Sequence, residues 1–419
     1  MAEKKAKPFG SLRPDVDDIL AWNELPQDAF EPASSEEKSS FIQDRESVSY
    51  WKDAWRRLRR NKVAMVAMVV VILIGLFAFV GPMIVPYSYD QVIPGANNLH
   101  PWHYSLEDQA AMDPELAVEE ARAAAEAEGR ELSRVEEATI RAQARSASTE
   151  DIKPRPFGYT NEELHRMENG EFVFPHVFGC DMQGRDIMAR TMIGARVSMI
   201  VGICCAIIVL VIGALYGSIS GYCGGKVDAV MQRIVEVIYT IPEVLIILLL
   251  GSTLKPILEE FQNSGDGFLQ DMVTLLGANL ISIFLTFGLL YWVTMSRLIR
   301  GQILQLKQQE YVTAARALGA SGGRIIKRHL LPNCIGQIVT TTFLQIPSAI
   351  FTESFLSFLG MGVTAPMTSL GSMCSDALGG LNTYPYRLFI PAAILSLMIL
   401  CLNLFGDGLR DALDPRLKK

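Results

Sequence analysis

Six long apolar runs, separated by polar segments, set the pattern of this chain. They cover residues 63–85, 197–219, 230–250, 273–295, 335–359 and 388–405. Each is close to the roughly 20 residues that a helix needs to cross a bilayer. Hydrophobic residues make up 50% of the 419 residues, and the mean hydropathy of +0.24 is high for a soluble protein of this length. The pattern predicts an all-α integral membrane protein with six transmembrane helices.

The basic residues between the apolar runs predict the orientation of these helices. An even number of spans puts both termini on one side of the membrane. The short segments assigned to the other side carry only Lys255 and Arg387. The segments assigned to the side of the termini carry Lys226, Arg297, Arg300, Lys307, Arg316, Arg324, Lys327, Arg328, Arg410 and Arg416. Because Lys and Arg accumulate in cytoplasmic loops, both termini are expected in the cytoplasm.

This topology divides the chain into five predicted parts. They are a cytoplasmic N-terminal extension with an amphipathic helix (1–62), the first transmembrane helix (63–85), an extracytoplasmic loop (86–196), a five-helix membrane core (197–405) and a cytoplasmic tail (406–419). The long loop contains a stretch rich in Ala, Glu and Arg, which predicts two helices broken at Gly129. This insertion is either a docking surface for a soluble partner or a solvated segment without a specific role.

The segment before the first apolar run combines aromatic and basic residues. Val48, Trp51, Trp55 and Leu58 share one helical face, and Arg and Lys residues crowd the others. This pattern is typical of an amphipathic helix that lies among lipid headgroups. A basic flank that only sets the orientation of the first span is an equally good interpretation.

A short polar segment, 310–333, lies between the fourth and fifth apolar runs and reads EYVTAARALGASGGRIIKRHLLPN. Tyr311, Ala314, Ala315 and Leu318 recur at helical spacing, so one face of a first helix is apolar and shallow. Gly319 suits the C-terminus of that helix. We therefore predict a cytoplasmic helical hairpin with a small apolar ridge on its first arm.

The second arm of this hairpin is predicted from its cap and stop residues. Ser321 can cap a second helix, and Pro332 is expected to end it. A short helix with an apolar ridge fits recognition by a groove on a partner, whereas the alternative is an ordinary connecting loop. A DNA-binding helix-turn-helix is disfavoured, because both ends enter the bilayer within a few residues.

The hairpin resembles the coupling-loop signature of ABC importer permeases, in which Glu-Ala-Ala, Gly and Ile-x-Leu-Pro occur at fixed spacing. The matching residues are Ala314, Ala315, Gly319, Leu331 and Pro332. Thr313 stands where the signature has Glu, and His329 stands where it has Ile. The resemblance implies contact with an ATPase through Glu310, Tyr311, Ala314, Ala315, Arg316, Leu318, Gly319, His329, Leu331 and Pro332. Thr313 lacks the carboxylate through which the signature Glu would make a polar contact to the ATPase.

Further segments resemble the C-type permease subunit of dipeptide and oligopeptide ABC importers. They are WKDAWRRLRRNKVAMV, HVFGCDMQGRDIMARTMIGARVSM, SFLGMGVTAP and NLFGDGLRDALDPR. Cys180 replaces the Thr that is usual in the second segment. The similarity covers nearly all of 48–417 except the insertion at about 105–150. Several motifs in the right order make this resemblance specific.

The resemblance implies a function and a set of partners. The chain is expected to be one permease of a peptide importer, beside a homologous second permease, ATP-binding cassette ATPase subunits, an extracytoplasmic peptide-binding protein and membrane lipid. Hydrolysis would belong to the ATPases, so the chain itself is not expected to be an enzyme. Permeases of this type also serve nickel chelates or glutathione, so the cargo stays open. No nucleic acid is expected.

Within the apolar runs, a few residues depart from a uniform lipid-facing helix. Pro242 should break or kink the third span, and Glu353 is an acid late in the fifth. Pro242 and Glu353 are the candidate residues of the transport pathway. Glu353 could meet a peptide's amino terminus there or pair within the bundle. Gly213, Gly217 and Gly221 form a small-xxx-small row that permits close helix packing.

Charged residues also gather just ahead of the second span. Asp181, Arg185 and Asp186 are followed by Arg190 and Arg196. They suggest paired groups that fix a pre-membrane helix, although arginines that reach toward the interface would account for much of the pattern.

Missing motifs argue against other classes of protein. The sequence contains neither G-x-x-x-x-G-K-[ST] nor H-E-x-x-H, so neither a nucleotide site nor a zinc protease is predicted. The close pair His100 and His103 is a weak metal candidate in a loop, and we expect no catalytic or metal-binding residue. The rival interpretations are an ATP-independent secondary transporter, which would show broken helices in two repeated halves, and a membrane scaffold.

Overall fold

The computed structural model describes the membrane core and most of the long loop. The described residues are 49–105, 108–109, 114–127, 130, 132–146, 154–240, 242–263, 267, 277–363 and 367–413. The chain separates into two units, Met1–Lys52 and Asp53–Lys419. Most of the first unit, and with it most of the predicted N-terminal extension, lies outside the described residues. The second unit contains all the sites discussed below.

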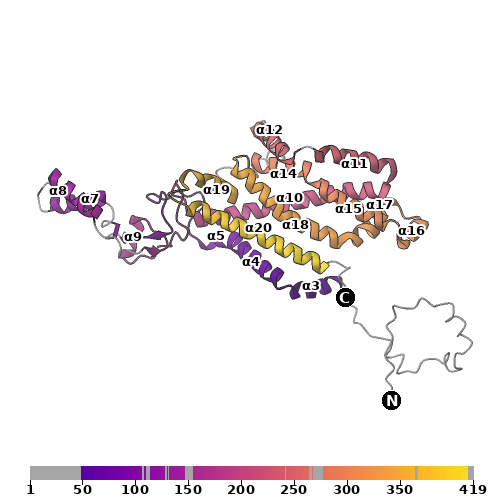
Figure 1. Cartoon of the computed structure of the whole chain (residues 1–419), viewed down its shortest axis with the longest axis horizontal. Helices are drawn as coiled ribbons and strands as arrows, with labels where there is room; N and C mark the ends of the chain where they lie inside the picture. The colour runs from indigo at the N-terminus through magenta and orange to yellow at the C-terminus, as the bar shows by residue number, and fades with distance from the viewer. Residues whose placement is uncertain are drawn as a thin grey trace, which may run out of the picture. The chain divides into compact units, whose positions relative to one another are not determined.

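The described part of the chain is built almost entirely from helices, as the apolar runs predict (Figure 1). The helices of the N-terminal half are α3 (Tyr50–Arg60), α4 (Lys62–Phe79), α5 (Gly81–Ile84), α7 (Pro114–Ala127), α8 (Arg134–Ser146), α9 (Asn161–Glu168) and α10 (Ile187–Cys223). They are followed by α11 (Gly225–Thr240), α12 (Glu243–Asn263), α14 (Ala278–Leu290), α15 (Trp292–Leu306), α16 (Glu310–Ala317), α17 (Gly322–Ile325), α18 (Ile335–Phe358), α19 (Leu370–Ala377) and α20 (Tyr386–Leu413). The strands β1 (Trp102–His103) and β2 (Arg155–Pro156) pair antiparallel, with Trp102 opposite Pro156.

Among the described residues, five helical stretches are long and apolar enough to cross a membrane. They are Lys62–Ile84, Ile187–Cys223, Leu280–Leu306, Gly322–Phe358 and Tyr386–Leu413. A sixth span results if the bent pair Gly225–Thr240 and Leu245–Phe261 is counted as one. The prediction of an all-α membrane protein is therefore confirmed. The second span begins before the apolar run at 197, where Asp186 caps its first turn, and the last span continues past 405 to Leu413.

The apolar run at 230–250 is broken where Pro242 predicts a break. The two halves, α11 and α12, meet at an angle of 88°. Pro242 precedes α12 and is exposed. Proline lacks the N–H that would continue the hydrogen-bond ladder, so a helix cannot run straight through this position without losing a bond.

The long helix α10 is central to the bundle and contacts α4, α15 and α18. Its glycine row lets the backbone of α15 approach closely. A Cβ at Gly217 would lie 2.4 Å from the Ser296 carbonyl oxygen, and one at Gly213 would lie 2.7 Å from the Met295 side chain. The predicted packing role of this row is confirmed.

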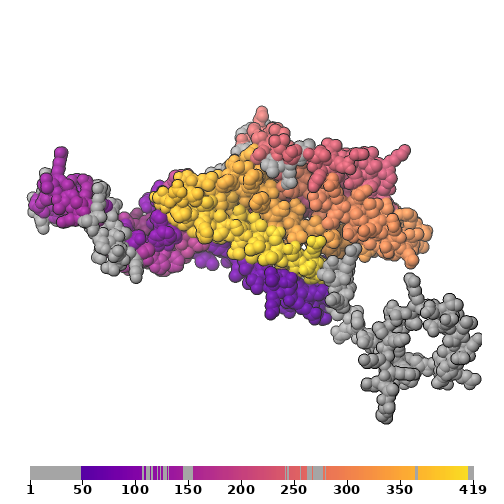
Figure 2. Space-filling model, viewed as in Figure 1, coloured from indigo at the N-terminus to yellow at the C-terminus, as the bar shows by residue number. Residues whose placement is uncertain are grey.

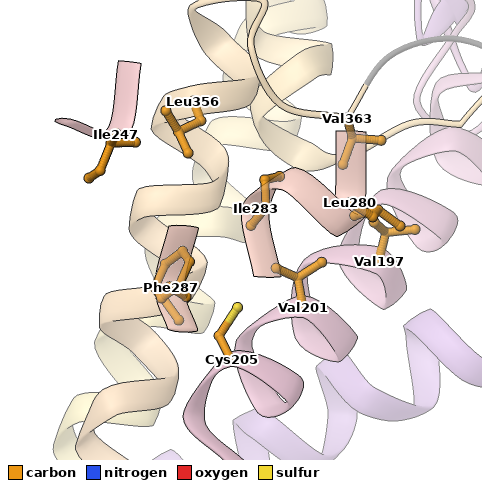
Figure 3. Close-up of a cluster of buried hydrophobic side chains, with 10 residues drawn as sticks. Val197, Val201, Cys205, Ile247, Leu280, Ile283, Phe287, Leu356 and Val363 are labelled. Atoms are coloured by element: carbon orange, nitrogen blue, oxygen red, sulfur yellow. The ribbon is translucent and has the colours of Figure 1, made fainter. Parts of the chain in front are cut away.

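A buried apolar cluster joins α10 to the helices on one side of it (Figure 3). Val201 and Cys205 come from α10, Ile283 and Phe287 from α14, and Leu356 from α18. On another side, α4 packs on α20 so closely that a Cβ at Gly408 would lie 2.2 Å from that of Ala64. The bundle is thus held by interdigitated side chains as well as by glycine contacts.

The insertion in the long loop forms two packed helices, α7 and α8, as its composition predicts. The predicted break at Gly129 falls between them and lies outside the described residues. An ion pair between Arg122 and Glu137 (2.5 Å) connects the two helices.

Candidate functional site

The hairpin between α15 and α18 has a buried base. Val312 of α16 is fully buried, although the predicted ridge does not include it. It joins a cluster of buried residues from α10, α15, the second arm and α18: Val209, Met295, Ile299, Ile303, Ile325, Leu330, Cys334 and Ile338. The hairpin is therefore continuous with the core of the bundle through its packing on α15 and α18.

Gly319 ends the first arm as predicted. Its φ of +79° lies in the left-handed region, where a Cβ is unfavourable. The N–H of Ala320 donates to the Ala315 carbonyl (3.1 Å), and the N–H of Gly319 donates to that of Arg316 (3.0 Å). These two bonds form a Schellman motif, which satisfies carbonyls that the helix end would otherwise leave open.

The predicted apolar ridge lies on the surface of the hairpin. Leu318 is 88% exposed at the turn, Tyr311 is 40% exposed, Ala314 is exposed and Ala315 is half-buried. The orange surface at the right of Figure 2 belongs to this part of the chain. Thr313, which stands at the place of the signature acid, is exposed as well. The hairpin therefore exposes small and apolar side chains on one surface, while its base is buried in the bundle.

The second arm differs from the prediction. Ser321 precedes α17 in an extended conformation, but its side chain makes no capping hydrogen bond. Pro332 does not end the helix, because α17 continues through a π-helical turn (Ile326–Leu330) and a 3-10 turn (Leu331–Cys334) into α18. The missing N–H of Pro332 removes one α-helical bond, and these non-α turns absorb the defect. The hairpin and the fifth span thus form one helical path.

Polar and aromatic contacts hold the hairpin to its neighbours. The Tyr222 ring of α10 packs against Gly322, where an added Cβ would lie 2.8 Å from the ring. Lys307 donates to the Gly221 carbonyl (2.8 Å). Asn333 donates to the Tyr311 hydroxyl (3.1 Å) and to the carbonyl of His329 (2.6 Å). His329 and Leu331 are half-buried and Pro332 is exposed.

A bidentate ion pair crosses from α11 to α15 beside the hairpin. The guanidinium of Arg300 donates through Nε to one carboxylate oxygen of Asp228 (2.6 Å) and through an amino group to the other (2.5 Å). Ser220 of α10 donates to the same carboxylate. In the sequence, Arg300 contributes only a positive charge to the predicted orientation of the membrane helices. Its pairing with Asp228 is not predicted.

The two residues proposed for the pathway lie in different environments. Pro242 is exposed at the bend, whereas Glu353 is fully buried. The Glu353 carboxylate accepts hydrogen bonds from Ser198 (2.7 Å), Ser357 (2.7 Å) and Ser354 (3.2 Å). Ser198 belongs to α10, so the buried acid connects α10 to α18. Its contacts are of the kind expected for pairing within the bundle.

At the N-terminal end of α10, away from the hairpin, the predicted charge pairing is confirmed. The Asp181 carboxylate accepts from Arg185 (2.8 Å) and from the buried Arg190, which also reaches Asp376 after α18 (3.2 Å). Burial favours a raised pKa for Asp181, but the backbone hydrogen bond from Arg185 and the charge of Arg190 outweigh it and lower the pKa. Arg196 donates to the Ala78 carbonyl of α4 (3.0 Å).

Next to this network lies a buried cluster that the sequence reasoning missed. His176, Cys180 and Asp186 are all buried, and their ligand-type atoms lie within 4.8 Å of one another. Burial favours a lower pKa for His176, but its hydrogen bonds to Asp186, Cys180 and Glu163 raise the pKa to about 11. His176 and Asp186 are ten positions apart in the sequence, so a search for short motifs does not find this cluster. The weaker metal candidate His103 is instead buried with its ring nitrogen 2.8 Å from the Phe157 carbonyl.

A bundle of this kind, with a projecting interhelical hairpin, defines a multi-pass α-helical membrane protein. Residues 210–419 match the family described as binding-protein-dependent transport system inner membrane component. Residues 49–101 match the N-terminal transmembrane domain of oligopeptide transport permease C. The chain therefore belongs to the family of binding-protein-dependent transport permeases, as its resemblance predicts.

Curated relatives match over nearly the whole chain. The oligopeptide transport system permease protein OppC of Bacillus subtilis is 34% identical over 395 residues, which cover 94% of this chain and 99% of that protein. The dipeptide transport system permease protein DppC of the same organism is 33% identical and covers 95% of both chains. OppC of Escherichia coli is 34% identical over 88% of this chain and 93% of that protein.

Proposed function

We propose that this chain is a permease subunit of an ABC-type importer that moves peptides across the cytoplasmic membrane. Its similarity to oligopeptide and dipeptide permeases extends over nearly the full length of both chains. The excess of basic residues in the short loops supports cytoplasmic termini and a cytoplasmic hairpin. Nickel chelates or glutathione are the alternative cargoes, and the peptide names of the relatives favour peptides.

We further propose that the 310–333 hairpin couples the permease to an ATPase subunit. The observation that carries this proposal is the contrast between Leu318, 88% exposed at the tip, and Val312, fully buried at the base. An apolar tip in water favours a partner that covers it. A buried base transmits displacement of that tip, because packed helices move together rather than deform continuously.

The proposed mechanism is mechanical. ATP binding closes a pair of ATPase subunits, each of which holds one coupling hairpin, one from this chain and one from a homologous second permease. Closure moves the hairpins, and the 310–333 hairpin carries α15 and α18 with it through the shared buried cluster. The two permeases then rock from an inward-facing to an outward-facing arrangement. A peptide-binding protein delivers its cargo, and hydrolysis resets the cycle.

The residues of the ridge suggest how the hairpin is held. Thr313 occupies the place of the signature acid, and its hydroxyl points back toward the Gln309 carbonyl (3.5 Å). Recognition therefore depends on shape: the small Ala314 and Ala315 let a groove approach closely, and Leu318 fills it. Arg316 is exposed on the same helix and adds charge at its C-terminus.

The proposal also assigns Pro242 and Glu353 to the pathway region. The 88° bend beside Pro242 gives α11 and α12 separate directions, so each half can tilt on its own. Glu353 is enclosed by hydroxyls between α10 and α18, which favours a structural pairing over direct contact with a peptide's amino terminus.

The test is Leu318→Asp in the complete transporter, reconstituted in proteoliposomes. A charge at the tip should lower both ATPase retention on co-purification and ATP-driven peptide uptake by about tenfold or more, which corresponds to roughly 1.4 kcal/mol of lost binding. The matched control is Phe172→Asp, since Phe172 is 89% exposed in the long loop. This control should retain the ATPase subunits.

Two outcomes would contradict the proposal. If Leu318→Asp keeps normal ATPase retention and normal uptake, the hairpin is not the coupling element. If the unmodified complex takes up peptide at full rate without ATP, the secondary-transporter interpretation is correct instead.

A further inference from the structure

His176, Cys180 and Asp186 bring a nitrogen, a sulfur and an oxygen to one buried point. They lie in the last part of the long loop and at the start of α10, where Asp186 is the N-cap residue. Their ligand-type atoms are within 4.8 Å of one another. Such a mixed donor set is typical of zinc sites, because thiolate and imidazole disfavour magnesium and calcium.

Each side chain of the cluster is already oriented. The two oxygens of Asp186 have separate partners: Oδ1 accepts from the Ala189 N–H (2.7 Å), and Oδ2 faces Nδ1 of His176 (2.7 Å). The ring of Tyr87 stacks on that imidazole, with 4.4 Å between centroids. The cluster therefore does not need to be assembled by large movements.

A second carboxylate supports the imidazole from its far side. Nε2 of His176 lies 3.3 Å from Glu163 Oε1. The other oxygen of Glu163 accepts from the Thr160 N–H (2.8 Å) in the capping box of α9, so its position is fixed. A carboxylate behind a histidine is the usual outer partner of a zinc-binding imidazole, where it holds the ring with Nε2 protonated and leaves Nδ1 for the metal.

We propose that His176, Cys180 and Asp186 form a zinc site, in which Glu163 orients the imidazole. Coordination requires a small adjustment, because two ligands of a tetrahedral zinc ion lie about 3.3 Å apart and Nδ1 and Oδ2 must move apart to that distance. The three residues leave a fourth position, which a water molecule completes. The site connects the loop around α9 to the first turn of α10.

The charge of the buried cluster is compatible with a divalent ion. Zinc binds thiolate and neutral imidazole, so it displaces the thiol proton of Cys180 and the Nδ1 proton of His176. Two protons leave when one zinc ion with two positive charges binds, so the net charge of the buried cluster does not change. This inference is independent of the transport function, since it concerns only how the loop is fixed to the bundle.

The decisive experiment measures metal bound by the full-length chain. Because the three residues are buried, zinc is supplied during expression as well as after purification. Elemental analysis after removal of loosely bound metal should find about one zinc per chain. Cys180→Ser should lose at least nine-tenths of it. The matched control is Cys374→Ser, since Cys374 is also buried and lies in α19 at the same end of α10. This control should retain its zinc.

Glu163→Gln separates an orienting role from a ligand role. It should weaken zinc binding by about 10–100-fold without abolishing it. A spectrum of the unmodified chain after cobalt replaces zinc provides a readout that needs no variant, and a thiolate-to-cobalt charge-transfer band is expected. Absence of that band, zinc content no higher than in Cys180→Ser, or equal loss in Cys374→Ser would each overturn the proposal.

Discussion

The two ends of α10 hold opposite kinds of surface. At its C-terminal end, Tyr222 packs on a hairpin that leaves Leu318 exposed at its tip. At its N-terminal end, Asp186 caps the helix and Arg190 is enclosed by Asp181 and Asp376. One end thus presents an apolar side chain that is 88% exposed, whereas the other end pairs its charges within the chain.

This difference indicates how the two ends contribute to function. A surface that is completed by another molecule must stay accessible, so its substitution should affect assembly more than stability. A buried charge network is completed within the chain, so its substitution should affect stability first, because a lost partner leaves a buried charge less well compensated. Variants at each end therefore separate the two roles.

The largest expected effect on stability is at the N-terminal end. Arg190→Leu removes the fully buried partner of Asp181, which keeps its half-buried partner Arg185, and should cost up to about 3 kcal/mol of unfolding free energy. Thermal or denaturant unfolding of the chain in detergent measures it. Arg166→Leu is the control, since Arg166 pairs with Glu171 at 2.7 Å on the exposed surface, where an ion pair contributes at most about 1 kcal/mol. Equal losses in the two variants would mean that the network does not hold this end.

A smaller effect is expected midway along α10. Gly217→Ala places a Cβ 2.4 Å from the Ser296 carbonyl oxygen, so α10 and α15 must separate. Overpacking of this kind costs about 1–3 kcal/mol. Gly301→Ala in α15 provides the control, because among the described residues no atom from outside its own helix backbone lies within 4 Å of the added Cβ. If Gly217→Ala unfolds at the same temperature as Gly301→Ala, close packing of these helices is not needed.

The sequence predicts features that depend on local pattern and misses those that depend on long-range contact. Six apolar runs, the break at Pro242 and the turn at Gly319 follow from residue properties within a few positions. Val312 was missed because its burial depends on Ile299 and Ile338, which belong to other helices. The pairing of Arg300 with Asp228 likewise joins positions 72 residues apart.

Pro332 shows why a correct local rule can still fail. Proline does disrupt the α-helical ladder, but the chain here widens into a π turn and narrows into a 3-10 turn instead of ending the helix. The packing of Leu330 and Cys334 in the hairpin base holds that path in place. Tertiary contacts therefore decide whether a proline ends a helix or only distorts it. These contacts join residues that are distant in the sequence, so a local pattern does not reveal them.

The smallest expected effect on stability is at the turn of the hairpin. Gly319→Ala keeps open space around the new Cβ but forces alanine to a φ of +79°, which should cost about 1–2 kcal/mol. Gly323→Ala has the same open space without positive φ, so it should be neutral or slightly stabilising.

Measured together, these two variants test whether the shape of the turn matters for coupling. Gly319→Ala should reduce ATP-driven uptake more than its small loss of stability explains, because the direction of Leu318 depends on the Schellman turn. Gly323→Ala should leave uptake unchanged. Equal uptake in both variants, with the expected difference in unfolding, would show that the exposed tip tolerates reorientation and that the ridge of Ala314 and Ala315 alone carries the contact.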